Sequence, residues 1–318
     1  MKISILKRFL KPASQQAGWF AVSISNKGVY FVHVQRAGGK PKVLHCSFHA
    51  SPNVTTELLD KFRKEEHIGN FQFTTLLALG EYQIILVDSP NVPESELKSA
   101  VRWSIKDALS YPVEAATVDV LPIPSPNSGN DRPKSLYVIA AQNAVVLKCI
   151  GMFERAKMNL KVIDIQEAAQ RNVAILFETE GRGVALLAFN DLGGMLTFTF
   201  NGELILARRI EITLGQLEDA DERQREQFLD RFELELQRSM DYFGRQFHYI
   251  SLSRLLVSSP EYLGLMKRLS SSVDLPVAQL NLSEVLDISA TPDLADSEYV
   301  AHFLPALGAA LRDEEGVS

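Results

Sequence analysis

Short apolar runs bounded by turn residues come in two groups of three along the chain, and both groups have the same order. The first group covers residues 18–49 and the second covers residues 183–212. Gly38-Gly39 separates two runs of the first group, and Asn201-Gly202 separates two runs of the second. Glycine and asparagine readily adopt the positive φ angles that tight hairpins need. Each group therefore predicts a meander of three antiparallel strands.

A helix and a further strand are predicted after each meander. In the first half a helix near 54–66 precedes strands at 73–80 and 82–89. In the second half a long helix covers 222–247, followed by a strand at 253–259 and a helix at 261–270. The long helix carries one apolar stripe at helical spacing, formed by Phe228, Phe232, Leu236, Met240, Phe243 and Phe247. The repeated order of elements predicts a duplicated α/β fold with two lobes and a cleft between them.

Further elements are predicted between the two halves. Pro93 opens a helix, because proline fits the first turn, where its missing N–H is not needed. The apolar face of this helix consists of Leu97, Ala100, Val101, Ile105 and Ala108. The elements expected after it are a strand at 115–124, a polar loop at 125–134, a strand at 135–142, a helix at 143–157, a strand at 160–165 and a helix at 165–177.

Composition and charge are typical of a folded soluble protein. Of the 318 residues 46% are hydrophobic and 23% are charged, and the formal net charge is −6. Without a basic surplus, nucleic acid is not an expected partner. No uncharged apolar run approaches the ~20 residues that a bilayer-spanning helix needs, so we expect a soluble, cytoplasmic protein. Cys46 and Cys149 lie far apart and predict buried thiols in a reducing compartment.

The first twelve residues form a basic N-terminal segment. Ile3, Leu6 and Leu10 fall on one helical face, and Lys2, Lys7, Arg8 and Lys11 add positive charge. These charges interrupt any apolar core of a signal peptide. A solvated terminus is the simpler interpretation, and weak attachment to an anionic membrane surface is the alternative.

Histidines gather in the first meander, but they do not predict a metal site. A hairpin turn at Gly38-Gly39 would place His33 and His45 on adjacent strands, with His45 and His49 on one face and Cys46 on the other. No second matched pair completes a ligand set. Because the common P-loop, nucleophile-elbow and zinc-protease motifs do not occur either, we predict no catalytic residue.

Several segments resemble, in sequence order and over nearly the whole chain, the PilM family of type IV pilus assembly proteins. They are VPESELKSAVRWSIKDALSYPVEAATVDV (92–120), FERAKMNLKVIDIQEAAQRNVA (153–174), NDLGGMLT (190–197), NGELILARRI (201–210), ELQRSMDYF (235–243) and FLPALGAALR (303–312). Weak nucleotide segments make the chain most similar to the MshI branch, found in mannose-sensitive haemagglutinin (MSHA) pilus systems.

The resemblance implies an α/β, duplicated actin-like (FtsA/PilM-like, RNase H-like) two-lobed fold with a small inserted subdomain at about 90–124. The first lobe would cover 13–178 and the second 179–318, with a C-terminal helix near 300–312 returning to the fold. The resemblance also implies a cytoplasmic protein that is peripheral to the membrane. It would bind the cytoplasmic N-terminal peptide of a PilN-like bitopic inner-membrane protein and join other assembly-platform proteins. Homodimer formation is left open.

The same resemblance allows a test for a nucleotide site. Asp191, Gly193, Gly194 and Thr197 match the family's D-x-G-x-x-x-T turn. The corresponding first turn, residues 23–28, has no acidic residue, and Ser258-Ser259-Pro260-Glu261 replaces the glycine-rich adenosine segment. Proline removes an N–H donor there, and Glu261 adds negative charge near a triphosphate. We therefore expect a degenerate nucleotide fold and no cofactor; the alternative is an Mg-ATP-binding switch or slow ATPase.

Trp103 is the expected anchor of a partner. It lies off the apolar stripe of its helix, and exposed tryptophans are favoured at interfaces. The alternative is that it packs under Tyr111-Pro112. Because the family's partner peptide binds beside the inserted subdomain, the resemblance suggests Leu97, Val101, Trp103 and Tyr111 as the docking area. A scaffold that grips an extended peptide is the favoured function; a filament-forming protein is a distant third possibility.

Overall fold

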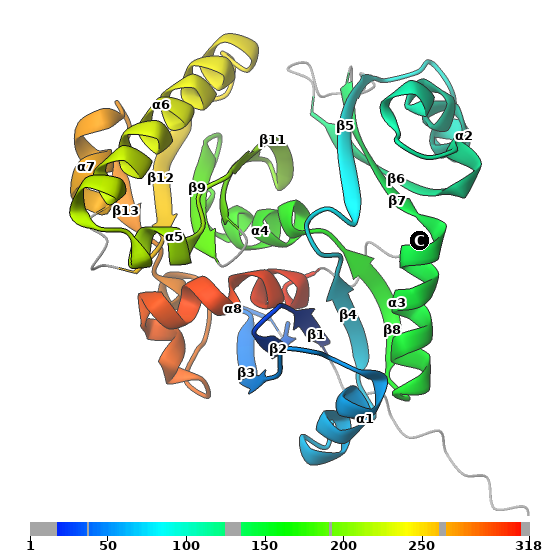
Figure 1. Ribbon diagram of the computed structural model, residues 1–318. Helices are drawn as coiled ribbons and strands as arrows, with labels where there is room; N and C mark the ends of the chain where they lie inside the picture. Colours follow the sequence, from blue (N-terminus) through cyan, green and yellow to red (C-terminus); the bar gives the residue numbers. More distant parts are fainter. Residues whose placement is uncertain (1–17, 37, 125–134, 191–192, 261–264, 313–318) are drawn as a thin grey trace, which may run out of the picture.

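The described residues of this computed structural model are 18–36, 38–124, 135–190, 193–260 and 265–312. They form three sheets with helices between and around them (Figure 1). The basic segment at 1–12 and the loop at 125–134 lie outside the described residues. No described helix is both long and apolar enough to cross a bilayer.

The first lobe is built on a five-stranded sheet with the order β3-β2-β1-β4-β8. β1 pairs antiparallel with β2 and parallel with β4, so the meander continues into a crossover through a helix. One face of the sheet packs against α1 (Thr56–Glu65) and α3 (Asn143–Arg155), which bury apolar side chains on it. The strands are β1 (Trp19–Ile24), β2 (Gly28–Gln35), β3 (Lys42–Ala50), β4 (Gln72–Leu76) and β8 (Asn159–Asp164).

The second lobe repeats this topology with the sheet order β11-β10-β9-β12-β13. Its outer face packs against α5 (Leu214–Asp219), α6 (Glu222–Gln246) and α7 (Leu265–Ser272). An Asp221–Gln224 capping box fixes the start of α6, and the predicted stripe of this helix faces the sheet. The strands are β9 (Gly183–Asn190), β10 (Gly193–Phe200), β11 (Glu203–Ile210), β12 (Leu252–Ser258) and β13 (Val277–Gln279).

Two helices fill the layer between the sheets. α4 (Gln166–Ala174) and α8 (Ser297–Ala310) share one apolar core with residues of both sheets, and α8 lies along β1 and β2 of the first lobe. The helices approach closely at Gly308, where a Cβ atom would lie 2.0 Å from the carbonyl oxygen of Ala169. The Asn172 side-chain amide donates to the carbonyl of Gly308 at 2.9 Å. Both lobes therefore share this buried helical layer.

A third sheet of three antiparallel strands forms the inserted subdomain, with the order β5-β7-β6. Its strands are β5 (Tyr82–Asp88), β6 (Ala116–Ile123) and β7 (Ser135–Gln142), and α2 (Glu94–Ser104) covers one face. The small sheet thus extends on both sides of the expected 90–124, because β5 and β7 belong to it rather than to the first lobe.

Most predicted elements are present with small shifts of their ends. The expected strand at 73–80 ends at Leu76, and the expected helix at 300–312 is α8. The helix predicted from 261 is described only from Leu265. α5 and β13 were not expected from the sequence; both are short, and neither carries enough residues to show a period.

Candidate functional site

The first turn that faces the cleft between the lobes satisfies its own backbone. The Ser25 hydroxyl accepts from the amides of Lys27 at 3.1 Å and Gly28 at 3.2 Å. The Ser25 amide donates to the Gly28 carbonyl at 2.8 Å. In a phosphate-binding turn, amides of this kind point at the ligand. Here the Ser25 hydroxyl already accepts hydrogen bonds from two such amides.

The second turn keeps its glycines for local reasons. Gly193 has φ +133°, and a Cβ atom there would lie 2.9 Å from the Ile210 carbonyl oxygen. At Gly194 a Cβ atom would lie 2.7 Å from the Phe189 ring. Thr197 is fully buried and accepts from the Gln170 side-chain amide at 3.1 Å, which ties β10 to α4. Asp191 lies outside the described residues, so nucleotide binding at the D-x-G-x-x-x-T turn stays a prediction.

The segment at the expected adenosine position is buried. Ser258 and Ser259 are each 1% exposed. The Ser259 carbonyl accepts from the Gln279 side-chain amide at 2.9 Å, so it is bonded to β13. Glu261 lies outside the described residues.

Little space separates the two turns. A cavity of about 30 Å³ lies between Ser25 and Asn190, and a second cavity of about 210 Å³ adjoins it beside Gly193 and Gly194. Ligand sites usually occupy roughly 300–1,000 Å³. Glu211 is the single carboxylate among the described residues that line these cavities. Each of the two cavities is therefore smaller than a usual ligand site, and one carboxylate lines them in the described part of the cleft.

The expected docking residues separate into buried and exposed side chains. Val101 is fully buried in the core under the small sheet, so its assignment to the docking area was wrong: it packs beneath the sheet, out of a partner's reach. Leu97 and Tyr111 are half-buried against the same core. Trp103 is 64% exposed, so it does not pack under Tyr111-Pro112.

A second exposed apolar residue lies on α3, which bonds the same segment, 113–117, as the end of α2. Arg102 donates to the carbonyls of Val113 and Ala116 at 3.1 and 2.9 Å, which fixes the end of α2 against the start of β6. Asn143 bonds both Glu114 and Thr117, which fixes the start of α3 on that segment. Leu147, one turn further along α3, is 65% exposed. It was missed, although Asn143 and Gly151 at i−4 and i+4 already place it off any apolar stripe.

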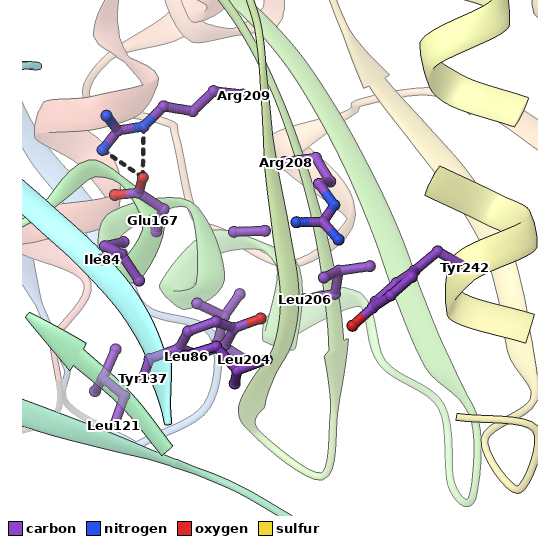
Figure 2. Close-up of a pocket in the computed structure, with 11 residues that line it drawn as sticks. Ile84, Leu86, Leu121, Tyr137, Glu167, Leu204, Leu206, Arg208, Arg209 and Tyr242 are labelled. Carbon is purple, nitrogen blue, oxygen red and sulfur yellow. Dashed lines mark hydrogen bonds and ion pairs between the residues drawn. The ribbon is translucent and has the colours of Figure 1, made fainter. Parts of the chain in front are cut away.

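An ion pair between a buried carboxylate and a partly exposed guanidinium joins the three units of the molecule (Figure 2). Glu167 of α4 is 2% exposed, and its carboxylate accepts from the Arg209 guanidinium of β11 at 2.7 and 2.8 Å. The Tyr82 hydroxyl, at the start of β5, donates to the same carboxylate at 2.5 Å. Burial and this carboxylate raise the pKa of Tyr82 well above its usual range. The Arg209 charge and the Tyr82 hydroxyl offset the free-energy cost of burying the Glu167 carboxylate.

Next to this ion pair a trough separates the small sheet from the second lobe. A cavity of about 280 Å³ lies between β5 and β11, and a cavity of about 330 Å³ continues it towards the end of α6. The two share Leu86, Tyr137, Leu206 and Tyr242. We call this space the β5–β11 trough. No sequence motif indicated it, because its walls come from distant segments.

The histidines of the first meander lie as expected but bind a carboxylate. His33 and His45 are cross-strand partners, and Cys46 pairs with Val32 on the opposite face. The Nε2 atoms of His45 and His49 lie 3.2 and 2.8 Å from the Glu66 carboxylate of α1. No group in the described part of the chain has the arrangement of a metal centre.

Comparisons with known proteins agree with this topology. No protein-family model matches the sequence, and no curated protein matches it. One chain of the PilM-PilN type IV pilus biogenesis complex superposes with a TM-score of 0.75 at 18% identity, over 93% of this chain and 98% of that chain. The fold is actin-like. Two duplicated five-stranded sheets around a helical layer, with an inserted small sheet, make up that architecture.

Other solved structures are more distant. The cytoplasmic domain of EpsL, an inner-membrane component of the Vibrio cholerae type II secretion system, aligns with a TM-score of 0.47 at 12% identity, over 85% of this chain and 87% of that domain. A Bacteroides thetaiotaomicron protein with an actin-like ATPase fold aligns with a TM-score of 0.49 at 12% identity, over 88% and 96% of the two chains. Both TM-scores are too low for either structure to bear on the function of the candidate site.

Proposed function

We propose that this chain is a non-enzymatic scaffold of a type IV pilus assembly platform, of the PilM kind and most similar to its MshI branch. In this role it binds the cytoplasmic N-terminal peptide of a PilN-like bitopic protein and reaches the inner membrane through that partner. The full-length structural similarity to a chain of the PilM-PilN complex is the observation that carries the proposal. The residues quoted above for the PilM resemblance support it independently.

The junction of α2, α3 and the start of β6 is the docking surface in this proposal. Trp103 and Leu147 expose large apolar side chains there, whereas the other large apolar residues of the two helices are buried or half-buried. Tryptophan is among the residues that contribute most to binding when a partner covers it. The hydrogen bonds of Arg102 and Asn143 to the segment 113–117 hold the two side chains on a rigid support.

Calorimetric titration of the full chain with a synthetic N-terminal peptide of the PilN-like protein from the same pilus system tests this function. We expect saturable binding that Trp103→Ala weakens by ~30-fold, equivalent to about 2 kcal/mol. Leu234→Ala is the matched control, because Leu234 is 48% exposed on α6 of the second lobe. No measurable binding, or equal losses in the two variants, would argue against the scaffold.

We also propose that the chain does not use ATP. The bonds of the Ser25 hydroxyl and the small cavity support this part of the proposal. The space beside Gly193 and Gly194 favours the competing function, a nucleotide-dependent switch. A ligand at a hundred times its Kd stabilises a protein by ~2.7 kcal/mol. We expect no thermal shift with millimolar Mg-ATP, and a shift of several degrees would establish the switch instead.

A further inference from the structure

We propose that the β5–β11 trough binds a second partner: an extended peptide segment in which an aliphatic side chain lies next to a carboxylate. This surface lies between the small sheet and the second lobe, away from the α2–α3 junction. The inference is therefore independent of the proposed PilN-like peptide.

The walls of the trough are apolar and incompletely covered. Alternate residues of β5 point to opposite faces of the small sheet. Ile85 and Val87 pack in the core under α2, whereas Ile84 and Leu86 line the trough. Leu86 remains 52% exposed even though it faces another part of the protein. An aliphatic side chain of a partner would pack against Leu86 and bury its exposed surface.

The trough runs between one face of the small sheet and the edge of the second-lobe sheet. Leu86 of β5, Leu121 of β6 and Tyr137 of β7 line the first wall, and β11, the terminal strand of the second lobe, forms the other. The Tyr137 hydroxyl bonds the outer edge of β11, donating to the Ile205 carbonyl at 3.2 Å. Burial raises the pKa of Tyr137 to about 12, so the phenol stays protonated as a donor. The edge strand of a sheet can accept an extended peptide as an additional strand, and pockets beside that edge then select alternate side chains of the peptide.

The charges in the trough favour an acidic segment. Glu167 is the single carboxylate among the described residues that line the two cavities, and Arg209 already pairs with it. Arg208 lies over the Tyr242 ring at 4.8 Å and forms no ion pair with any described residue (Figure 2). Its guanidinium is held in place without a counter-charge. A carboxylate of the partner would complete this site.

Selection from a phage-displayed library of random twelve-residue peptides on the full-length protein tests the proposal. We expect enriched peptides that combine an aliphatic residue with Asp or Glu. Fluorescence anisotropy with a synthetic, labelled copy of the most enriched peptide would then show saturable binding. Arg208→Glu and Leu86→Lys should each weaken it at least tenfold, because one opposes the carboxylate and the other removes the apolar contact.

Matched variants keep the test specific. Arg223→Glu and Leu234→Lys change exposed residues of α6 that do not line the trough, and Trp103→Ala changes the other proposed surface. All three should bind the selected peptide as the unchanged protein does, with equal melting temperatures. Failure to enrich any peptide, or binding insensitive to Arg208→Glu and Leu86→Lys, would overturn the proposal. So would a dimer in sedimentation analysis that Leu86→Lys dissociates, or displacement of the peptide by a small organic anion such as citrate.

Discussion

At the scale of single residues, several polar side chains do structural tasks that their types alone would not reveal. Ser25 closes the first turn with its own hydroxyl, and Thr197 fastens β10 to the central helix. Gly193 and Gly194 are explained by the close approach of Ile210 and Phe189. Local packing therefore accounts for the two glycines and the threonine of the motif without reference to a ligand.

His45, which shares the Glu66 carboxylate with His49, gives the fold a pH dependence. Burial lowers the pKa of His45 below its usual value; the Glu66 carboxylate opposes this shift and His49 adds to it. The unfolded chain therefore takes up the proton first as the pH falls through about 6.5, so the folded state loses stability towards acid. We expect the melting temperature to fall between pH 7.5 and 5.5, and to fall less in His45→Gln. Equal pH profiles for the two proteins would contradict this assignment.

At the scale of elements, the sequence predicted both meanders, the long helix and most connections, because each has a clear period and turn residues at its ends. The prediction was weakest where an element is too short for a period, as in α5 and β13. It also missed that β5 and β7 belong to the inserted sheet, since pairing between distant strands is not visible in the local sequence pattern. Trp103 was found from its place off a stripe, whereas the ion pair of Glu167 and Arg209 could not be found in this way.

The contact of α4 with α8 gives an element-scale prediction. Gly308→Ala places a methyl group within 2.0 Å of the Ala169 carbonyl oxygen, so the helices must separate. We expect a loss of about 1–3 kcal/mol in the free energy of unfolding, measured with urea. Gly244→Ala in α6 is the control, because nothing lies within 4 Å of its Cβ position. It should be neutral or stabilise the helix by up to ~1 kcal/mol; equal effects at both positions would show that the helices can separate without cost.

At the scale of the whole molecule, one buried carboxylate connects the lobes and the inserted sheet. Glu167 comes from the central layer, Arg209 from the second lobe and Tyr82 from the start of the insertion. Movement of these units relative to one another would strain or break hydrogen bonds to a carboxylate that is 2% exposed. We therefore expect this ion pair to hold the β5–β11 trough at a fixed width.

Variants of Glu167 and Arg209 should lose unfolding free energy in a defined order. Arg209→Leu leaves the Glu167 carboxylate buried without its cation, which we expect to cost about 2–4 kcal/mol of unfolding free energy. Glu167→Gln removes the charge but keeps an acceptor for Tyr82, so its cost should be about 1 kcal/mol. The double variant should be more stable than Arg209→Leu alone. Urea denaturation of the three proteins measures the order; a larger loss in Glu167→Gln than in Arg209→Leu would contradict it, and unchanged stability in all three would show that the pair does not contribute.

The position of α8 has a consequence for biosynthesis. This helix is translated after every other described element, yet its residues from Val300 to Leu311 complete the core that the two sheets share. A nascent chain on the ribosome therefore carries an open apolar surface on each lobe until the final helix emerges. Messages truncated before the codon of Ser297 should yield products that chaperones retain or proteases remove, so the cell receives the protein only in its finished form.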